Sequence, residues 1–287
     1  MEFIIEYGMF FAKTLTFTVA VLLVILAAIG SAAKTKKEPK GAISITHLNK
    51  EIDDLSDEIK YVIEDKENLK KAKKENKKAE KKKQKEKRKG DTDNDKKRYY
   101  VFDFNGDSRA SQVEDMRKVI TAVLTVIRSE KDEIILRLES PGGMVHGYGL
   151  AASQLERIKS LNIPLTICVD KVAASGGYMM ACLGSKIISA PFAYIGSIGV
   201  LMQLPNFNRL LKEKNIDYEV VTAGEYKRTL TMFGENTEKG RAKVAEEIND
   251  AHDLFKDFVK ENRPVLDIDK VATGEAWFGK KALELKL

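Results

Sequence analysis

Histidine, cysteine and tryptophan are scarce in this sequence, and their scarcity limits the chemistry that the chain can perform. It has three histidines, two cysteines and one tryptophan in 287 residues. Cys168 and Cys182 lie in apolar surroundings without the paired spacing of a zinc site, which favours two small buried side chains over a disulfide. Metal catalysis lacks a set of ligands, so neither a metal nor another cofactor is expected.

The basic segment before the folded domain lacks both apolar periodicity and aromatic residues. Between Lys66 and Arg98 about 17 basic residues accompany about 7 acidic ones, so this segment carries roughly +10, whereas the whole chain carries +6. It cannot bury enough apolar surface to fold alone and is predicted to be a solvated linker. Specific nucleic-acid binding is not expected without aromatic residues for base stacking, and contact with anionic lipid headgroups fits the composition better.

One long hydrophobic run lies near the N-terminus. Thr14–Ala33 is almost wholly apolar and long enough to cross a bilayer as a helix, and Gly8–Ala12 extends it beyond Lys13. Ser31–Ala33 offers the small residues of a signal-peptide cleavage site, but the length of the run and the acidic N-terminus favour an uncleaved anchor. The lysines directly after the run favour a cytoplasmic position for the rest of the chain.

These features divide the chain into three parts. Residues 1–33 are the predicted transmembrane anchor, residues 34–98 an amphipathic helix plus the Lys/Glu-rich linker, and residues 99–287 the folded domain. The amphipathic helix is predicted over His47–Asp65, where apolar residues recur every three or four positions. Such a stripe more often packs against a neighbour than binds a ligand.

From Tyr99 onward, strand-like and helix-like segments alternate, which implies parallel crossovers and an α/β sheet. The predicted strands are Tyr99–Phe104, Ile134–Leu138, Pro164–Val169, Lys186–Ser189, Tyr194–Met202 and Tyr218–Thr222. The predicted helices are Ser111–Arg128, Leu150–Leu161, Tyr178–Leu183, Asn206–Lys214 and Thr237–Glu261.

The segment Asp170–Tyr178 is the most informative turn of the domain. Ser175 lies where a buried strand bends sharply into a helix, a position that lifts a nucleophilic hydroxyl out of the sheet. A helix N-cap is the alternative interpretation of the same serine. Ser140–Gly143 ends the preceding parallel strand, so the two turns are expected side by side, with the N–H groups of Gly143 and Gly176 as an oxyanion hole. The alternative is that each of these two segments is an ordinary turn without a role in catalysis.

A nucleophilic serine needs a base, and the residues alone leave its identity open. His47 lies before the domain and His252 on a polar helix, so His146 is the histidine nearest to the candidate site, but no carboxylate is evidently placed to orient it. A lysine with a lowered pKa is the other type of base. Lys227 follows a predicted buried strand, although its sequence context is also that of a surface lysine.

Five motifs in order resemble the SppA/SohB family of membrane-anchored Ser/Lys peptidases, peptidase family S49, and in particular its SohB-type members. The motifs are Leu138–Gly149, Asp170–Met179, Ile195–Val200, Gly224–Thr229 and Ala272–Gly279. The resemblance implies a Clp/crotonase-like fold of repeated strand-helix units, with Ser175 as nucleophile, Lys227 as general base and Ser197 as the residue that orients the lysine. It further implies a homo-oligomeric ring with sites shared between protomers, and membrane-derived peptides or misfolded proteins as substrates.

Two departures accompany the resemblance. Family members continue past the last motif with a Gly-Leu-Val-Asp segment and a tail, whereas this sequence ends at Leu287, which suggests a truncated C-terminus. The family implies a periplasmic domain at the bacterial inner membrane, against the cytoplasmic side that the lysines favour. The alternative functions are a non-catalytic membrane scaffold and a crotonase-like acyl-CoA enzyme; a Clp-like Ser/His protease is disfavoured because no histidine lies between Ser175 and Gln203.

Overall fold

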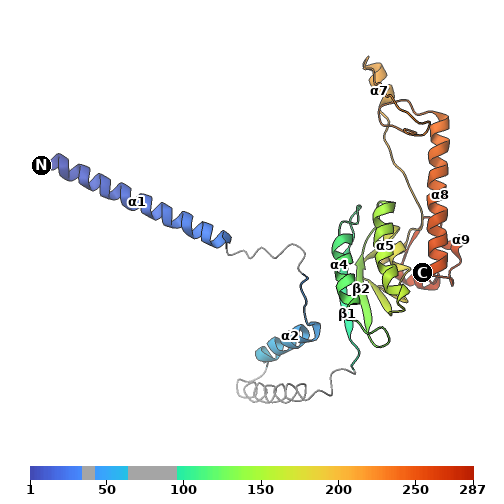
Figure 1. The fold of residues 1–287 in the computed structure, drawn as a ribbon, viewed down its shortest axis with the longest axis horizontal. Coiled ribbons are helices and arrows are strands. Elements are labelled where there is room, and N and C mark those ends of the chain that lie inside the picture. The colour runs from blue at the N-terminus through green and yellow to red at the C-terminus, as the bar shows by residue number, and fades with distance from the viewer. Residues whose placement is uncertain (34–42, 64–95) are drawn as a thin grey trace. The chain divides into compact units, whose positions relative to one another are not determined.

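The computed structural model describes residues 1–33, 43–63 and 96–287 (Figure 1). These residues form two compact units, Met1–Ile59 and Lys60–Leu287. The predicted linker between Lys66 and Arg98 falls almost entirely outside the described residues.

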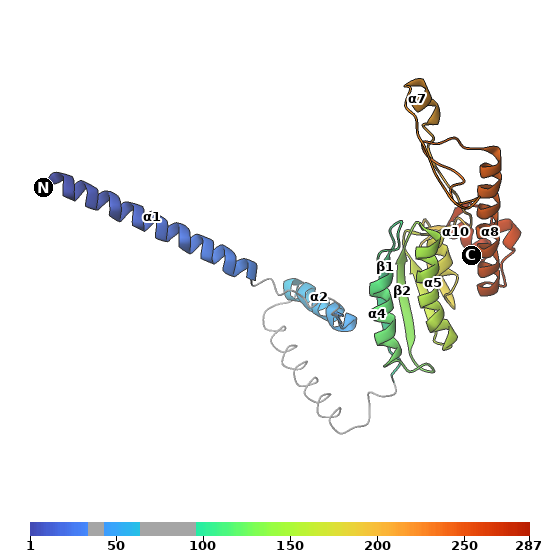
Figure 2. The same cartoon turned by 45° about the horizontal axis from the view of Figure 1, so that its top comes forward.

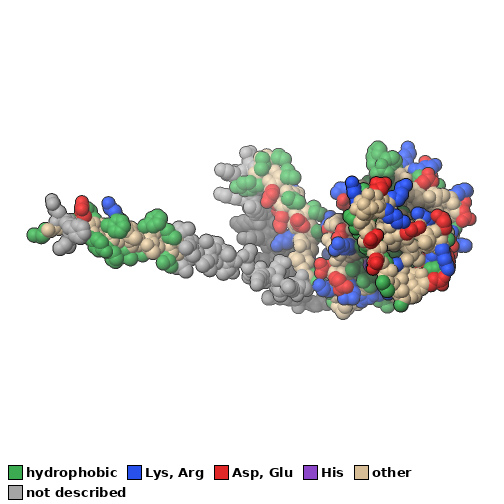
Figure 3. Space-filling view, turned by 90° about the horizontal axis from the view of Figure 1, so that it is seen from above, with side chains coloured by type: hydrophobic (Ala, Val, Ile, Leu, Met, Phe, Trp, Pro, Cys, Tyr) green, Lys and Arg blue, Asp and Glu red, His purple; other side chains and the backbone are tan. Residues whose placement is uncertain are grey.

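Two helices precede the folded domain. Helix α1 (Glu2–Ala33) covers the predicted hydrophobic run, and by length and composition its segment Ile5–Leu22 could cross a membrane. In Figure 3, hydrophobic side chains predominate along the part of this helix that is coloured by type. Helix α2 (Leu48–Ile63) confirms the predicted amphipathic helix, and none of its residues is buried by the described part of the chain.

The domain is built on a parallel sheet of four strands in the order β1-β2-β3-β5, which confirms the α/β prediction. The strands are β1 (Tyr99–Asn105), β2 (Glu133–Glu139), β3 (Leu165–Val169) and β5 (Lys186–Ser189). Alternate side chains of β2 and β3 are buried in the core, as expected where a sheet packs against helices: Ile134, Leu136, Leu138, Leu165, Ile167 and Val169.

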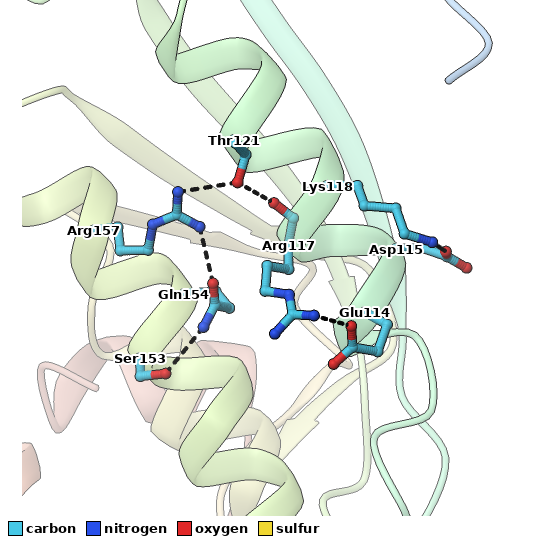
Figure 4. Close-up of polar contacts among 8 residues, drawn as sticks. All are labelled: Glu114, Asp115, Arg117, Lys118, Thr121, Ser153, Gln154 and Arg157. Atoms are coloured by element: carbon cyan, nitrogen blue, oxygen red, sulfur yellow. Dashed lines mark hydrogen bonds and ion pairs between the residues drawn. The ribbon is translucent and has the colours of Figure 1, made fainter. Parts of the chain in front are cut away.

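Helices α4 (Val113–Leu124) and α5 (Val145–Ser160) lie side by side against this sheet (Figure 2). Their outer edges are joined by polar contacts (Figure 4). The Arg157 guanidinium donates to Thr121 Oγ1 at 3.0 Å and to Gln154 Oε1 at 3.0 Å. These contacts fix α5, whose first turn follows the Ser140–Gly143 turn.

A second sheet of three short strands carries the candidate nucleophile. Strand β4 (Val172–Ala174) pairs in parallel with β6 (Tyr194–Gly196), and β6 pairs antiparallel with β7 (Ala276–Phe278). The remaining helices are α6 (Gly176–Ala181), α7 (Asn208–Glu213), α8 (Glu238–Asn262), α9 (Ile268–Val271) and α10 (Gly279–Glu284).

The segment before α8 differs from the prediction. We call residues 201–236 the arm; in Figures 1 and 2 its helix α7 projects beyond the end of α8. The predicted strand Tyr218–Thr222 is wrong for the single chain, since no strand forms there and Val221 is 96% exposed. The predicted strand Tyr194–Met202 ends at Gly196. A segment rich in β-branched and aromatic residues forms a strand only where another strand offers hydrogen-bond partners. In the described part of one chain, no strand offers such partners to Tyr218–Thr222.

Candidate active site

Ser175 lies at a bend from a strand into helix α6, as the sequence predicts, but the strand is β4 and not the predicted Pro164–Val169, which forms β3 of the main sheet. Its backbone has φ +51° and ψ −121°, a conformation that a residue with a side chain adopts only under constraint. The constraint comes from both sides, because the Ser175 N–H donates to the Gly196 carbonyl at 2.8 Å and the Ser175 carbonyl accepts from the Met179 N–H at 2.9 Å. The serine is half-buried, and its hydroxyl accepts no cap hydrogen bond from α6.

The Ser140–Gly143 turn lies directly beside Ser175. Ser140 joins the two sheets, because its N–H donates to the Val172 carbonyl at 2.8 Å and its carbonyl accepts from the Ala174 N–H at 3.0 Å. Gly142 has φ +89°, and a Cβ atom added there would lie 2.7 Å from the Gly176 nitrogen and 2.7 Å from Ser175 Cβ. Only glycine fits this approach, which brings the two expected oxyanion turns together.

The two expected oxyanion donors have N–H groups available. Among the described residues, no hydrogen-bond acceptor faces the N–H of Gly143 or of Gly176. Gly176 is the first residue of α6, where a backbone N–H has no partner within its own helix. Unpaired donors next to a candidate nucleophile are suited to binding a negatively charged oxygen.

A buried group of hydroxyls behind the turn was not predicted from the sequence. The Ser140 and Tyr148 hydroxyl oxygens are 2.5 Å apart, and both residues are fully buried. The Tyr148 hydroxyl also donates to the Asp107 carbonyl at 2.8 Å, and the Gly142 N–H donates to Ser140 Oγ at 3.1 Å. Burial raises the pKa of Tyr148, so its hydroxyl stays protonated at neutral pH. The only sequence signal was the position of Tyr148 inside the Leu138–Gly149 motif.

Ser197 lies near Ser175, because the carbonyl of its neighbour Gly196 accepts the hydrogen bond from the Ser175 N–H. Ser197 has φ +54°, its N–H donates to the Glu275 carbonyl at 2.6 Å, and its hydroxyl donates a long hydrogen bond of 3.4 Å to the Gly274 carbonyl. The Ser197 oxygen therefore keeps lone pairs that are suited to accepting a hydrogen bond from an amine.

Lys227 is not brought to Ser175 within one chain. It is exposed on the arm, and no hydrogen bond between its side chain and Ser175 occurs in the ranges that the structure describes. Its neighbours lie against the first turns of α8: Glu225 pairs with Lys239, and Lys243 lies 5.6 Å from the ring centre of Tyr226.

Helix α8 reaches the core with Phe255, twelve residues after Lys243. At 1.5 Å per residue, these twelve residues span about 18 Å along the helix. The segment around Lys227, which lies against the first turns of α8, is therefore about 18 Å from the position at which Phe255 enters the core. The expectation that Lys227 follows a buried strand is therefore wrong, because the segment before it is exposed and forms no strand.

The other candidate positions carry no comparable arrangement. His146 is exposed on the first turn of α5, and no carboxylate pairs with it in the described ranges. A cavity of about 510 Å³ lies at the opposite ends of the parallel strands, next to Ile163 and Ser185, and contains none of the predicted catalytic residues. Within residues 1–33, 43–63 and 96–287, no three side chains gather as metal ligands.

Comparison with known proteins gives consistent matches along the chain. Residues 2–155 match the description peptidase family S49 N-terminal, and residues 157–287 match peptidase family S49. A probable protease SohB of Haemophilus influenzae is 52% identical over 98% of this chain and 81% of its own length. A probable protease SohB of Buchnera aphidicola subsp. Schlechtendalia chinensis is 46% identical over 100% of this chain and 95% of its own length. Protease 4 of H. influenzae is 25% identical over 56% of this chain and 27% of its own length.

Proposed function

The chain belongs to peptidase family S49, whose members are serine peptidases with a Ser/Lys dyad on a Clp/crotonase-like fold, and from this premise we propose that it is a membrane-anchored endopeptidase with Ser175 as nucleophile and Lys227 as general base. The observation that carries the proposal is the contact of the constrained Ser175 bend with the Gly142–Gly143 turn. A crotonase-like acyl-CoA enzyme is disfavoured by the family.

The proposed reaction is acyl transfer to the serine. The neutral Lys227 amine takes the proton from Ser175, and the Ser175 oxygen attacks the carbonyl carbon of a peptide bond. The negative charge that develops on the carbonyl oxygen is held by the N–H groups of Gly143 and Gly176. The protonated lysine then gives its proton to the leaving amine, and water releases the acyl-enzyme. Ser197 accepts a hydrogen bond from the lysine and orients it.

We propose that the lysine is supplied by a neighbouring copy in a homo-oligomeric ring. Two observations support this: Lys227 is exposed in the single chain, and it lies on an arm with many exposed apolar side chains, as at an uncovered interface. The apolar side chains are Leu201, Met202, Phe207, Leu210, Ile216, Tyr218, Val220, Val221, Tyr226, Met232 and Phe233. Burial in an interface would also favour the neutral amine that the base requires.

Helix α1 supports a tether to the bacterial inner membrane. It is long and apolar enough to span the bilayer, and the substrates that fit this position are membrane-derived peptides and misfolded proteins. We therefore place the three proposed parts at residues 1–33, 34–98 and 99–287, as anchor, helix with linker, and peptidase domain.

The test uses the full chain in detergent. Hydrolysis of unfolded casein and of a fluorogenic peptide is compared for the wild type, Ser175→Ala, Lys227→Ala and His146→Ala. The first two variants are expected to lose at least about 10³-fold in kcat, because they remove the two reacting groups, whereas His146→Ala is expected to stay near the wild type.

Mixing the two inactive variants tests the shared site. Mixed assemblies contain sites with an intact Ser175 from one copy and an intact Lys227 from another, so part of the activity is expected to return. Full activity of Ser175→Ala would refute the assignment of the nucleophile, and the absence of any recovery on mixing would refute the sharing of sites between copies.

A further inference from the structure

We propose that Tyr148 and Ser140 are positioning residues, which hold the oxyanion turn in its working conformation through a buried chain of hydrogen bonds. The proposal rests on the proposed function of Ser175, Gly143 and Gly176. Neither side chain touches the reacting atoms; both act through the backbone of the turn.

The direction of the hydrogen bonds follows from the number of protons. Tyr148 has one hydroxyl proton, and it is donated to the Asp107 carbonyl at 2.8 Å. In the 2.5 Å contact between the two hydroxyls, Ser140 is therefore the donor. The Ser140 oxygen is left to accept from the Gly142 N–H at 3.1 Å. The hydrogen bonds thus run from the Gly142 N–H through the Ser140 and Tyr148 hydroxyls to the Asp107 carbonyl, and every donor in this series has an acceptor.

This series of hydrogen bonds orients the backbone of Gly142, the residue before the proposed donor Gly143. Because the Gly142 N–H points inward to Ser140, it is not available to a substrate, and the donor offered by this turn is the next N–H, that of Gly143. The hydrogen bonds that join Gly142, Ser140 and Tyr148 are buried, so water does not compete for them, whereas the one from Tyr148 to the Asp107 carbonyl is partly buried. Hydrogen bonds in such surroundings hold the backbone more firmly than exposed ones.

Tyr148 acts on the second donor with its ring. A Cβ atom added at Gly176 would lie 2.3 Å from the Tyr148 Cγ atom, so the Gly176 backbone rests directly on the ring. The Tyr148 ring also packs in the core against Phe104, in a T-shaped arrangement with 6.4 Å between the ring centroids. One tyrosine therefore holds both donors, Gly143 through its hydroxyl and Gly176 through its ring.

The far end of the hydrogen-bond chain is anchored as well. The Asp107 carboxylate accepts from the Ser111 N–H at 2.8 Å, from the Ser111 hydroxyl at 2.7 Å and from the Arg109 N–H at 3.1 Å. These hydrogen bonds, with that from the Ser111 N–H as the largest cause, lower the pKa of Asp107. The Ser108 carbonyl accepts from the Met144 N–H at 2.8 Å, which ties this loop to the residue after the turn.

The decisive variant is Tyr148→Phe, which removes the hydroxyl and keeps the ring. Removal of one oxyanion donor costs about 10²–10³-fold in kcat, and here the donor is loosened and not removed. We therefore expect kcat to fall about 10- to 30-fold while KM changes less than about twofold. Inhibition by a peptide aldehyde, whose adduct with serine carries the oxyanion, is expected to weaken by a similar factor. A loss of folding alone would lower the amount of active enzyme and would not move this inhibition constant.

Tyr178→Phe is the matched control. Tyr178 is also fully buried and lies two residues after Gly176, but its hydroxyl has no hydrogen-bond partner among the described residues. This variant loses the same atom and is expected to keep the kcat, KM and aldehyde inhibition of the wild type. Ser140→Ala is expected to match Tyr148→Phe, and the double variant to lose no more than the worse single one, because both residues belong to one chain of hydrogen bonds.

Amide hydrogen exchange gives a readout that does not depend on activity. The Gly142 N–H is expected to exchange at least about tenfold faster in Ser140→Ala and in Tyr148→Phe than in Tyr178→Phe, because its acceptor is lost or loosened. Wild-type kinetics in Tyr148→Phe would overturn the inference while leaving the proposed function intact. If the wild type shows no hydrolysis that depends on Ser175, the proposed function fails; in that case unchanged Gly142 exchange overturns the positioning role and faster exchange supports it.

Discussion

Gly142→Ala is the substitution that tests most directly how the two turns fit together. Gly142 has φ +89°, and its added Cβ atom would lie 2.7 Å from both the Gly176 nitrogen and Ser175 Cβ. The substitution therefore combines backbone strain with a collision against the proposed nucleophile Ser175 and the proposed donor Gly176.

The magnitude follows from these two effects. A side chain at positive φ costs about 1–2 kcal/mol per residue. Carbon atoms in good contact are about 3.5–4.0 Å apart, so the turns must separate by about 1 Å. A displacement of about 1 Å in an active site costs about 100-fold in rate, which is about 2.7 kcal/mol of transition-state stabilisation.

Gly274→Ala is the control for strain without collision. Gly274 has φ +82°, and an added Cβ atom would meet nothing within 4 Å. Gly274→Ala is expected to lower the Tm by about 2–6 °C. Gly142→Ala adds overpacking of about 1–3 kcal/mol and is expected to lower the Tm by about 5–15 °C. Trp277, the single tryptophan, lies on β7 of the small sheet and reports unfolding by its fluorescence.

The assay measures kcat/KM on a fluorogenic peptide, normalised to the fraction of enzyme that a fluorophosphonate labels at serine. Gly142→Ala is expected to lose about 100-fold per labelled site. If it keeps kcat/KM within about threefold of the wild type and its Tm falls no further than that of Gly274→Ala, the contact between the two turns does not exist in the working enzyme, and the reasoning is refuted.

Two further predictions concern stability and reactivity. Asp132 is fully buried, and hydrogen bonds from the Arg128 side chain lower the pKa of its carboxyl although burial opposes this. Asp132→Asn is therefore expected to lower the free energy of unfolding by about 3 kcal/mol above pH 5. Because the pKa of Asp132 is lower in the folded than in the unfolded state, the stability difference between wild type and Asp132→Asn is expected to shrink as the pH falls below about 4. Thermal melts that show the same difference at pH 3 as at neutral pH would contradict the role of the carboxylate. Burial raises the pKa of Cys182 to about 12, so iodoacetamide at pH 8 is expected to label it only after unfolding; rapid labelling of the native protein would contradict its burial.

Local sequence patterns were sufficient for the α/β domain and for the bend at Ser175. Apolar residues define β2 and β3 whatever lies elsewhere: buried positions alternate along β2, whereas β3 is a short apolar run that is buried along most of its length. Small residues after a buried strand predict the sharp turn, and the structure has it with φ +51° at Ser175. The pattern made Ser175 a candidate nucleophile, whereas the proposed pairing of Ser175 with Lys227 came from the family resemblance.

Three features depended on the tertiary structure. Tyr218–Thr222 has the composition of a strand, but a strand needs hydrogen-bond partners that composition does not reveal, and the described part of one chain offers none. The position of Lys227 depends on how the arm lies along α8, which no local pattern contains.

The chain of hydroxyls from Gly142 to Asp107 is the third feature. It joins Tyr148 to a carbonyl 41 residues earlier, and hydroxyls find such partners only when folding has removed them from water. The sequence by itself determined the four-stranded sheet, the helices that pack on it and the bend at Ser175, because burial acts on each segment separately; the short strands β4 and β7 of the second sheet were not predicted. Only the tertiary structure decided which backbone groups meet at that turn, because those contacts form between distant segments.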